Sequence, residues 1–173
     1  DILVTLQKPT TGNIIIRKLT EYKFGLFASE KYLRQREPVK SIKDLKKHKN
    51  IGYIDDLLFD QDLKFIGELG SGIKTQFRSS TLMTQTYAVM EGGGIAVLPY
   101  FVANQIESLI PVLPEKSIKR EFWLQVNPDT RQLARVKTTI DFIVSEVEKS
   151  KSLFQSLAAK KDVYADGIIS GSQ

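Results

Sequence analysis

Apolar and polar positions along the chain follow two periods, one typical of strands and one typical of helices. Strand-like runs occupy residues 1–6, 14–19, 22–29, 50–55, 74–79, 95–98 and 120–126. The first run is expected to be a buried strand, and the second and third are expected to be separate, adjacent strands because only a few polar residues divide them. Strands alternating with helices predict an α/β fold with largely parallel sheets.

Helical spacing is most regular near the end of the chain. From Leu133 to Leu157 apolar residues recur at steps of three and four, and Asp129 or Thr130 is expected to cap this helix. Shorter helical segments are predicted in residues 29–35, 41–48, 82–91 and 99–106, with Ser41 and Asp44 forming a capping box. Residues 162–173 show no periodicity and are expected to fray.

Composition narrows the class of protein. The chain has 173 residues, of which 42% are hydrophobic, enough for one ordinary domain or two small lobes. It contains no cysteine, which excludes disulfides and thiolate sites. No apolar run approaches the ~20 residues that a membrane-spanning helix needs. The net charge of +5 suits an anionic partner without identifying one.

Three consecutive glycines, Gly92 to Gly94, suggest a phosphate-binding loop at first sight. Such loops follow a strand and precede a helix, so that backbone N–H groups meet the anion at the positive end of the helix. Here a helical segment precedes the glycines and an apolar strand, residues 95–98, follows them. We therefore interpret the glycines as a helix ending, with one residue in the left-handed conformation and another permitting close packing.

The start of the same helix is the better candidate for a binding site. Ser79, Ser80 and Thr81 place three hydroxyls beside free backbone N–H groups, directly after a strand, where ligands of open α/β sheets bind. A carboxylate or a similar anion would fit there. The alternative is that Ser80 only caps the helix, as in most helices.

Other polar residues follow predicted strands and could line the same crevice. They are Gln7, Lys8 and Thr10 after the first strand, and Asp55 and Asp56 after the strand that ends near residue 54. Adjacent carboxylates in an extended chain point to opposite sides, so the aspartate pair is a poor metal site.

The remaining candidates are interpreted as structural. His48, the only histidine, lies in the run KKHK and is expected to be a solvated surface residue. The lysines around it are 40, 43, 46, 47 and 49, and they have no interleaved aromatic residues, which favours a charged face over a nucleic-acid site. Trp123 is expected in the core of a sheet. No hydrolase, zinc-protease or nucleotide-binding motif is present in the sequence.

Four segments together resemble the effector-binding domain of LysR-type transcriptional regulators. They are DILVTL, YKFGLFASEKYL, STLMTQTYAVMEGGGIAVLPYFVA and REFWLQVNPDTRQLARVKTTIDFI, and the resemblance extends from about Asp1 to about Val147. It implies two Rossmann-like lobes around a central cleft, as in type II periplasmic binding proteins. The lobes would comprise residues 1–28 with 116–157, and 29–115 as an insertion, followed by a tail from 158 to 173.

The resemblance also implies a function and a set of site residues. A small anionic effector would bind in the cleft and modulate DNA binding by an attached winged helix-turn-helix domain, with no cofactor and no catalysis. The implied contacts are Ser79, Ser80 and Thr81, Gln7 and Lys8, and Tyr53 to Asp55. We expect a bacterial, cytoplasmic regulator that is a homodimer or tetramer at full length.

The chain departs from the family pattern at its start. It lacks the winged helix-turn-helix, and we expect it to be truncated at the N-terminus, without the first strand and helix of the domain. Two rival functions stay open, an extracytoplasmic solute-binding protein and an enzyme with two lobes that uses Lys or Asp. A secretory leader would favour the first rival and ligand turnover the second.

Overall fold

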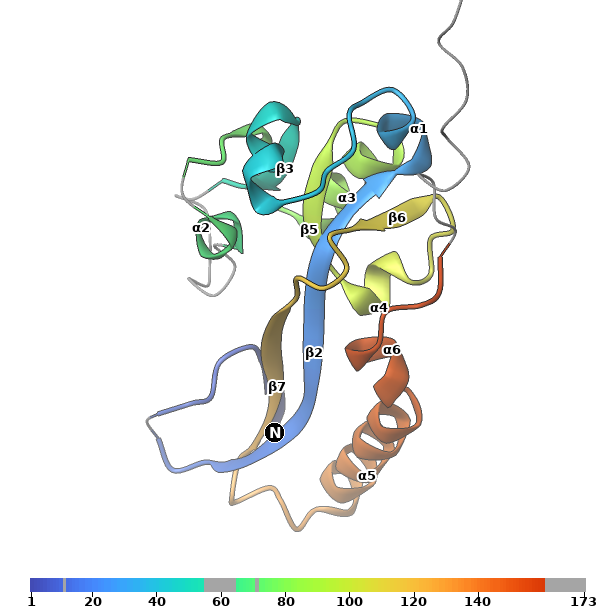
Figure 1. Ribbon diagram of the computed structural model, residues 1–173. Helices are drawn as coiled ribbons and strands as arrows, with labels where there is room; N and C mark the ends of the chain where they lie inside the picture. Colours follow the sequence, from blue (N-terminus) through green and yellow to red (C-terminus); the bar gives the residue numbers. More distant parts are fainter. Residues whose placement is uncertain (11, 55–64, 71, 161–173) are drawn as a thin grey trace, which may run out of the picture. The chain divides into compact units, whose positions relative to one another are not determined.

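The computed structural model describes residues 1–10, 12–54, 65–70 and 72–160 (Figure 1). The chain forms two compact units, one of Asp1–Lys23 with Lys119–Ser156 and one of Phe24–Ile118 with residues 157–160. It therefore passes between the units three times, after Lys23, after Ile118 and after Ser156.

The first unit is a small sheet with a helix. Its strands are β1 (Ile2–Thr5), most of β7 (Ile118–Val126) and the first part of β2 (Ile15–Ser29), in the order β1-β7-β2. β1 pairs antiparallel with β7, and Ile2 lies opposite Val126. The helices are α5 (Ala134–Lys149) and α6 (Lys151–Gln155).

Apolar side chains from β7 and α5 form the core of this unit. Leu124, Val126 and Val136 are buried, and Ile140 packs against them together with residues from β1 and β2. Tyr22 stacks on Phe122 at 4.2 Å between ring centroids in the same unit. The apolar stripe of α5 is thus buried at Val136 and half-buried at Ile140, Ile143, Val144 and Val147, as for a helix that lies on a small sheet.

Three expectations for the first unit are wrong. β1 is not a buried strand, because Leu3 and Val4 are 56% and 43% exposed. Ile15–Ser29 form the single strand β2 rather than two adjacent strands. The long helix begins at Ala134 and not after a cap at Asp129 or Thr130, because Asn127 accepts hydrogen bonds in a turn there, and it ends at Lys149, with α6 following.

The second unit is a mixed sheet. β5 (Ile95–Pro99) lies between the end of β2 and β3 (Asn50–Tyr53), and β4 (Thr75–Ser79) follows β3. β3 is parallel to β4 and β5, whereas β2 is antiparallel to β5 and to β6 (Leu109–Val112). The expectation of largely parallel sheets is therefore corrected to a mixed α/β architecture.

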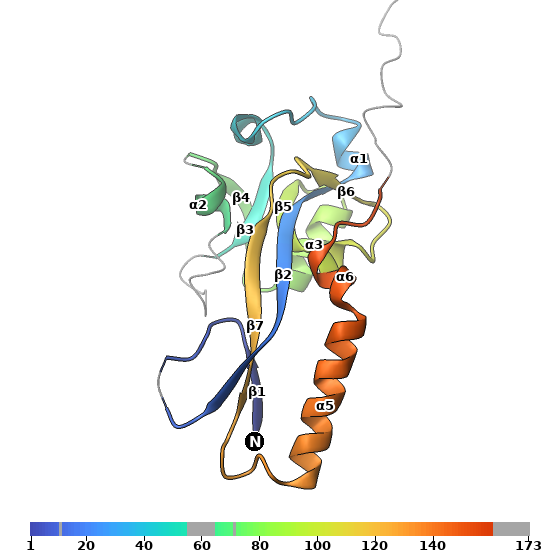
Figure 2. The same cartoon turned by 60° about the horizontal axis from the view of Figure 1, so that its bottom comes forward.

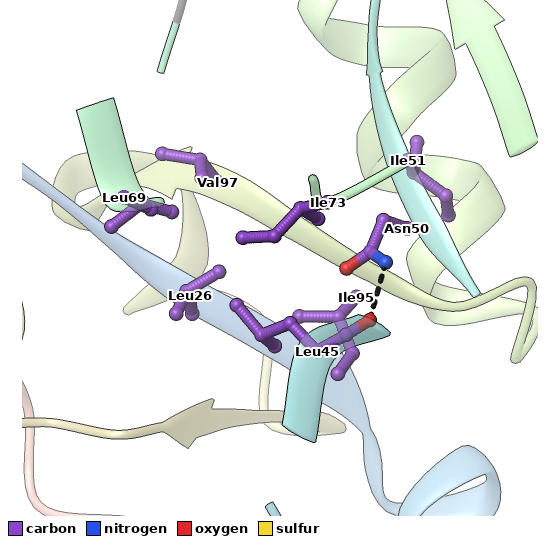
Figure 3. A pocket seen from close by; sticks show the side chains of 8 residues that line it. All are labelled: Leu26, Leu45, Asn50, Ile51, Leu69, Ile73, Ile95 and Val97. Carbon is purple, nitrogen blue, oxygen red and sulfur yellow. Dashed lines mark hydrogen bonds between the residues drawn. The ribbon is translucent and has the colours of Figure 1, made fainter. Parts of the chain in front are cut away.

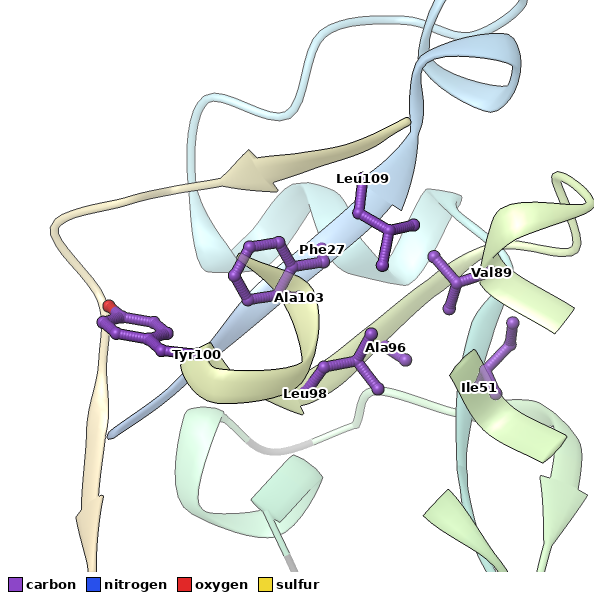
Figure 4. Close-up of a cluster of buried hydrophobic side chains, with 8 residues drawn as sticks. All are labelled: Phe27, Ile51, Val89, Ala96, Leu98, Tyr100, Ala103 and Leu109. Atoms are coloured by element: carbon purple, nitrogen blue, oxygen red, sulfur yellow. The ribbon is translucent and has the colours of Figure 1, made fainter. Parts of the chain in front are cut away.

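Short helices surround this sheet. They are α1 (Glu30–Leu33), the 3-10 helix η1 (Ile42–Lys47), α2 (Phe65–Leu69), α3 (Leu82–Met90) and α4 (Tyr100–Ala103). Figure 4 shows a core in which Phe27, Leu98 and Leu109 gather with Val89 of α3 and Ala103 of α4. The sheet is buried on both faces along β5, which explains why residues 95–98 form an uninterrupted apolar run.

The glycines end α3 as the sequence indicates. Gly92 has a φ of +81°, the left-handed conformation of a helix ending. A Cβ on Gly93 would lie 2.7 Å from the carbonyl oxygen of Ala88, and a Cβ on Gly94 would lie 2.3 Å from that of Lys49. These close approaches bring α3 and the start of β5 onto β3.

His48 is buried, which corrects its assignment to the solvated surface. Only 5% of the residue is exposed, and its Nδ1 lies 3.2 Å from the Tyr32 hydroxyl. That hydroxyl also accepts the N–H of Lys49 at 2.9 Å, so its own proton is free to point at His48. Asn50 extends this polar group, because its side-chain amide donates to the carbonyls of Leu45 and His48.

Candidate functional site

The carboxyl ends of β3 and β4 lie side by side in the second unit. Tyr53 is the register partner of Ser79 in this parallel pair. α3 begins three residues after β4, so the positive end of its dipole is directed at the same edge of the sheet. This is the position at which open α/β sheets bind ligands.

Ser79 is a structural residue at this edge. It is only 9% exposed, and its hydroxyl oxygen accepts the N–H of Thr81 at 3.1 Å. The side-chain amide of Gln85 donates to the Ser79 carbonyl at 3.4 Å, which ties the end of β4 to α3. The backbone of the turn is therefore fixed by its own side chains.

Thr81, and not Ser80, caps α3. The Thr81 hydroxyl accepts the N–H of Thr84 at 3.2 Å and lies 2.8 Å from the Thr84 hydroxyl. Ser80 is exposed, and its hydroxyl makes no hydrogen bond within the described part of the chain. Of the three predicted hydroxyls, that of Ser80 is thus the one available to a ligand.

Tyr53 adds a neutral phenol to the same edge. The residue is half-buried, and this burial raises the pKa of the Tyr53 phenol, so the group remains protonated at neutral pH. Its ring centroid lies 6.4 Å from that of Phe65. Asp55, predicted beside it, lies outside the described residues.

The predicted residues after β1 belong to the first unit. Lys8 is exposed and its ammonium lies 5.3 Å from the centroid of the Trp123 ring, a cation–π distance. Trp123 is half-buried on β7 and supports Lys8 with its ring. The Gln7 carbonyl accepts a hydrogen bond from the Thr5 hydroxyl at 2.9 Å, and this bond shapes the loop. Thr10 is exposed.

Two residues that organise the site were not singled out for it from the sequence. Gln85 and Thr84 were not among the candidates, yet their side chains hold Ser79 and Thr81 in place. The signal for Gln85 was a polar side chain on an otherwise apolar helical face. Such a residue, when buried, needs a hydrogen-bond partner nearby.

A cavity lies against Ile95 and Val97 of β5, on the face of the strand opposite to Ala96 and Leu98, and it is too small for an effector (Figure 3). Its volume is about 10 Å³, roughly the space of one water molecule. Apolar side chains including Leu26, Ile73 and Val97 line it, and Asn50 is its polar residue. Among the described residues, no group of three His, Cys, Asp or Glu is placed to hold a metal ion, and no helix is long and apolar enough to cross a membrane.

Solved structures with the same fold include regulatory domains of LysR-type transcriptional regulators. That of CrgA, a LysR-type transcriptional regulator from Neisseria meningitidis, superimposes with a TM-score of 0.70 at 22% identity, covering 84% of this chain and 74% of that domain. The regulatory domain of AphB from Vibrio vulnificus gives a TM-score of 0.69 at 21% identity, covering 84% and 75%. The CcmR regulatory domain from Synechocystis, in complex with 2-PG, gives 0.64 at 14% identity, covering 84% and 73%.

Comparisons with full-length regulators and with family models assign the chain to a family. The chain spans about half of full-length CrgA, 52% of that chain. No curated protein matches the sequence. The family model of the LysR substrate binding domain matches residues 1–148. On that match, this chain belongs to the family of LysR substrate binding domains.

Proposed function

We propose that this chain senses a small anionic effector for a bacterial LysR-type transcriptional regulator, and that the effector binds at the start of α3. Domains of this family are the ligand-sensing parts of such regulators. The effector would act by preferring one of two conformations of the protein, and it can shift their populations only by its differential affinity for them. No step of chemistry on the ligand is involved.

One observation carries the proposal, namely that the Ser80 hydroxyl is exposed at the positive end of α3 while its neighbours are fixed. Thr81 satisfies one N–H of the helix, and the N–H groups of the first turn that remain can donate to an anion. Tyr53 contributes a neutral hydroxyl from the adjacent strand end. A carboxylate or phosphate oxygen suits this set of donors.

Further features are proposed on the family assignment. We propose that the effector also contacts the loop of Gln7, Lys8 and Thr10, and Asp55 beyond β3. We propose lobes of residues 1–28 with 116–157 and of 29–115, a cytoplasmic location, and a homodimer or tetramer for the full-length regulator. DNA recognition would be the role of a separate winged helix-turn-helix domain.

The experiment is a thermal-shift screen followed by calorimetry. Small monocarboxylates, dicarboxylates and phosphorylated acids are screened for ligands that raise the melting temperature, since a ligand at 100 times its Kd adds about 2.7 kcal/mol of stability. For the best ligand, Ser80→Ala is expected to weaken binding about tenfold, the effect of one lost hydrogen bond to a charged group, without changing the stability of the free protein.

Thr81→Ala is the control for Ser80→Ala, because it removes the neighbouring hydroxyl that caps α3. Loss of its cap should lower the free energy of unfolding by about 1 kcal/mol. An outcome in which Ser80→Ala leaves the affinity unchanged for every ligand of the screen would show that the start of α3 is not the effector site.

A further inference from the structure

The net charge of the protein is concentrated in one short segment. Residues 30–49 contain eight Lys or Arg and three Asp or Glu, a surplus of five that equals the net charge of the whole chain. Six of these cations have exposed side chains and no ion pair to any acidic group within the described residues. We call them the basic face, and they are Lys31, Arg36, Lys40, Lys43, Lys46 and Lys49.

The acidic groups of the segment are already engaged. Glu30 pairs with Arg34, their oxygen and nitrogen 2.5 Å apart, and Glu37 lies 3.8 Å from the ammonium of Lys47. The Asp44 carboxylate accepts the N–H and the hydroxyl of Ser41 at 2.8 and 2.9 Å. The basic face therefore keeps its charge available for a partner.

A rigid frame supports the basic face. Lys49 donates its backbone N–H to the buried Tyr32 hydroxyl, and the Asn50 amide ties down the carbonyls of Leu45 and His48. Leu45 is completely buried beneath η1. Figure 2 shows α1 and the segment that contains η1 at one end of the second unit. Lys31 is thus held on α1, Lys43 and Lys46 are held on η1, and Lys49 is anchored through its backbone N–H.

The chemistry of the basic face fits duplex nucleic acid better than a single strand. Proteins that bind single strands stack bases on exposed aromatic rings. The segment 30–49 contains no Phe or Trp, and its one Tyr, Tyr32, is buried with the Arg36 guanidinium 5.7 Å from its ring centroid. Duplex DNA requires only that cations neutralise phosphates, and such contacts give affinity without reading sequence.

We propose that the basic face contacts the phosphate backbone of duplex DNA and so adds sequence-independent affinity to the regulator. The family assignment makes DNA the polyanion that this domain works beside. Lys31 and Lys49 of the basic face lie beside Gly92 and Gly94, at the end of α3, whereas the proposed effector site is at the start of that helix. This inference therefore stands or fails independently of the proposed effector site.

The test measures binding of this chain to a fluorescein-labelled 20-base-pair duplex of arbitrary sequence. Four phosphate contacts would give a slope of about −3.6 in log affinity against log salt, which is a loss of roughly 100-fold between 50 and 200 mM salt. Replacing Lys43, Lys46 and Lys49 by Gln is expected to weaken binding at 50 mM at least tenfold and to flatten the slope to about −1.

The matched control replaces three exposed lysines elsewhere, Lys116, Lys119 and Lys137, by Gln. It changes the net charge equally and should bind DNA within about twofold of the original protein. Equal losses in both variants would mean that binding follows net charge alone, and no binding at 50 mM salt would also overturn the proposal. Equally tight binding of polyglutamate would instead indicate an acidic protein as partner.

Discussion

At the scale of single residues, the buried His48 links the stability of the protein to pH. Burial lowers the pKa of the His48 imidazole, and the nearby Arg36 guanidinium lowers it further, while Asp44 and Glu37 act in the opposite direction. The Tyr32 hydroxyl can donate to Nδ1 only while that nitrogen is unprotonated. The folded state therefore favours the neutral imidazole.

This preference predicts a loss of stability in mild acid. Above the ordinary histidine pKa of about 6.5, His48 is neutral in both the folded and the unfolded chain, and its full contribution to the free energy of unfolding is present. As the pH falls through 6.5 towards the lower folded-state pKa, the unfolded chain binds the proton first, so the free energy of unfolding decreases. Urea denaturation between pH 7.5 and 5.5 should show this decrease, and His48→Gln should flatten it. An unchanged slope in His48→Gln would assign the titration to another group.

The burial of His48 could not be predicted from the run KKHK because it depends on a residue distant in the sequence. His48 follows η1 with an extended backbone, and its Nδ1 lies 3.2 Å from the hydroxyl of Tyr32 on another element. The capping residue of α3 was misplaced by one position for a different reason, since Ser80 and Thr81 are both good caps.

At the scale of elements, the sequence predicted best where a local rule decides the structure. The order of α3, the glycine turn and β5 followed from the direction in which glycine ends helices. β2 was divided in the prediction because Thr20 and Glu21 interrupt an apolar pattern. The structure continues the strand through them, because the Thr20 side chain is buried and Glu21 is exposed, as alternation in a strand allows.

The glycine turn makes a prediction of its own. Gly94 has a φ of +152°, and an added methyl group would lie 2.3 Å from the Lys49 carbonyl, which accepts the Ile95 N–H. Gly94→Ala should therefore lower the free energy of unfolding by roughly 2–4 kcal/mol, from overpacking and an unfavourable φ. Chemical denaturation measures this change.

Gly67→Ala is the control for that substitution. Gly67 lies within α2, and an added Cβ would meet nothing within 4 Å. Because alanine is the better helix former, this variant should be neutral or more stable by up to about 1 kcal/mol. Equal effects of the two substitutions would mean that the close approach at Gly94 does not constrain the turn.

At the scale of the whole molecule, the chain returns to the second unit after Ser156 and packs residues 157–160 against it. These residues lie after the part of the chain, residues 1–148, that the family model matches. Leu157 packs against the core of the second unit, and the Ala158 N–H donates to the Asn104 side chain at 3.0 Å. The Lys160 ammonium then donates to the Ile106 carbonyl at 2.7 Å and to those of Ala103 and Asn104 at 3.4 Å. The Ala103 carbonyl ends α4 and the other two follow it, so the cation also meets the negative end of that helix.

Lys160→Met tests whether this segment stabilises the second unit, because methionine keeps most of the apolar stem and removes the charge. We expect the free energy of unfolding to fall by about 1–2 kcal/mol, the effect of losing hydrogen bonds from a charged donor. Limited proteolysis should also become faster near residue 157. Lys151→Met is the control, since Lys151 makes only an exposed ion pair with Glu148 at 3.6 Å, and its loss should cost less than about 0.5 kcal/mol. If both variants were equally stable and equally resistant to protease, the segment after α6 would contribute nothing to holding the second unit together.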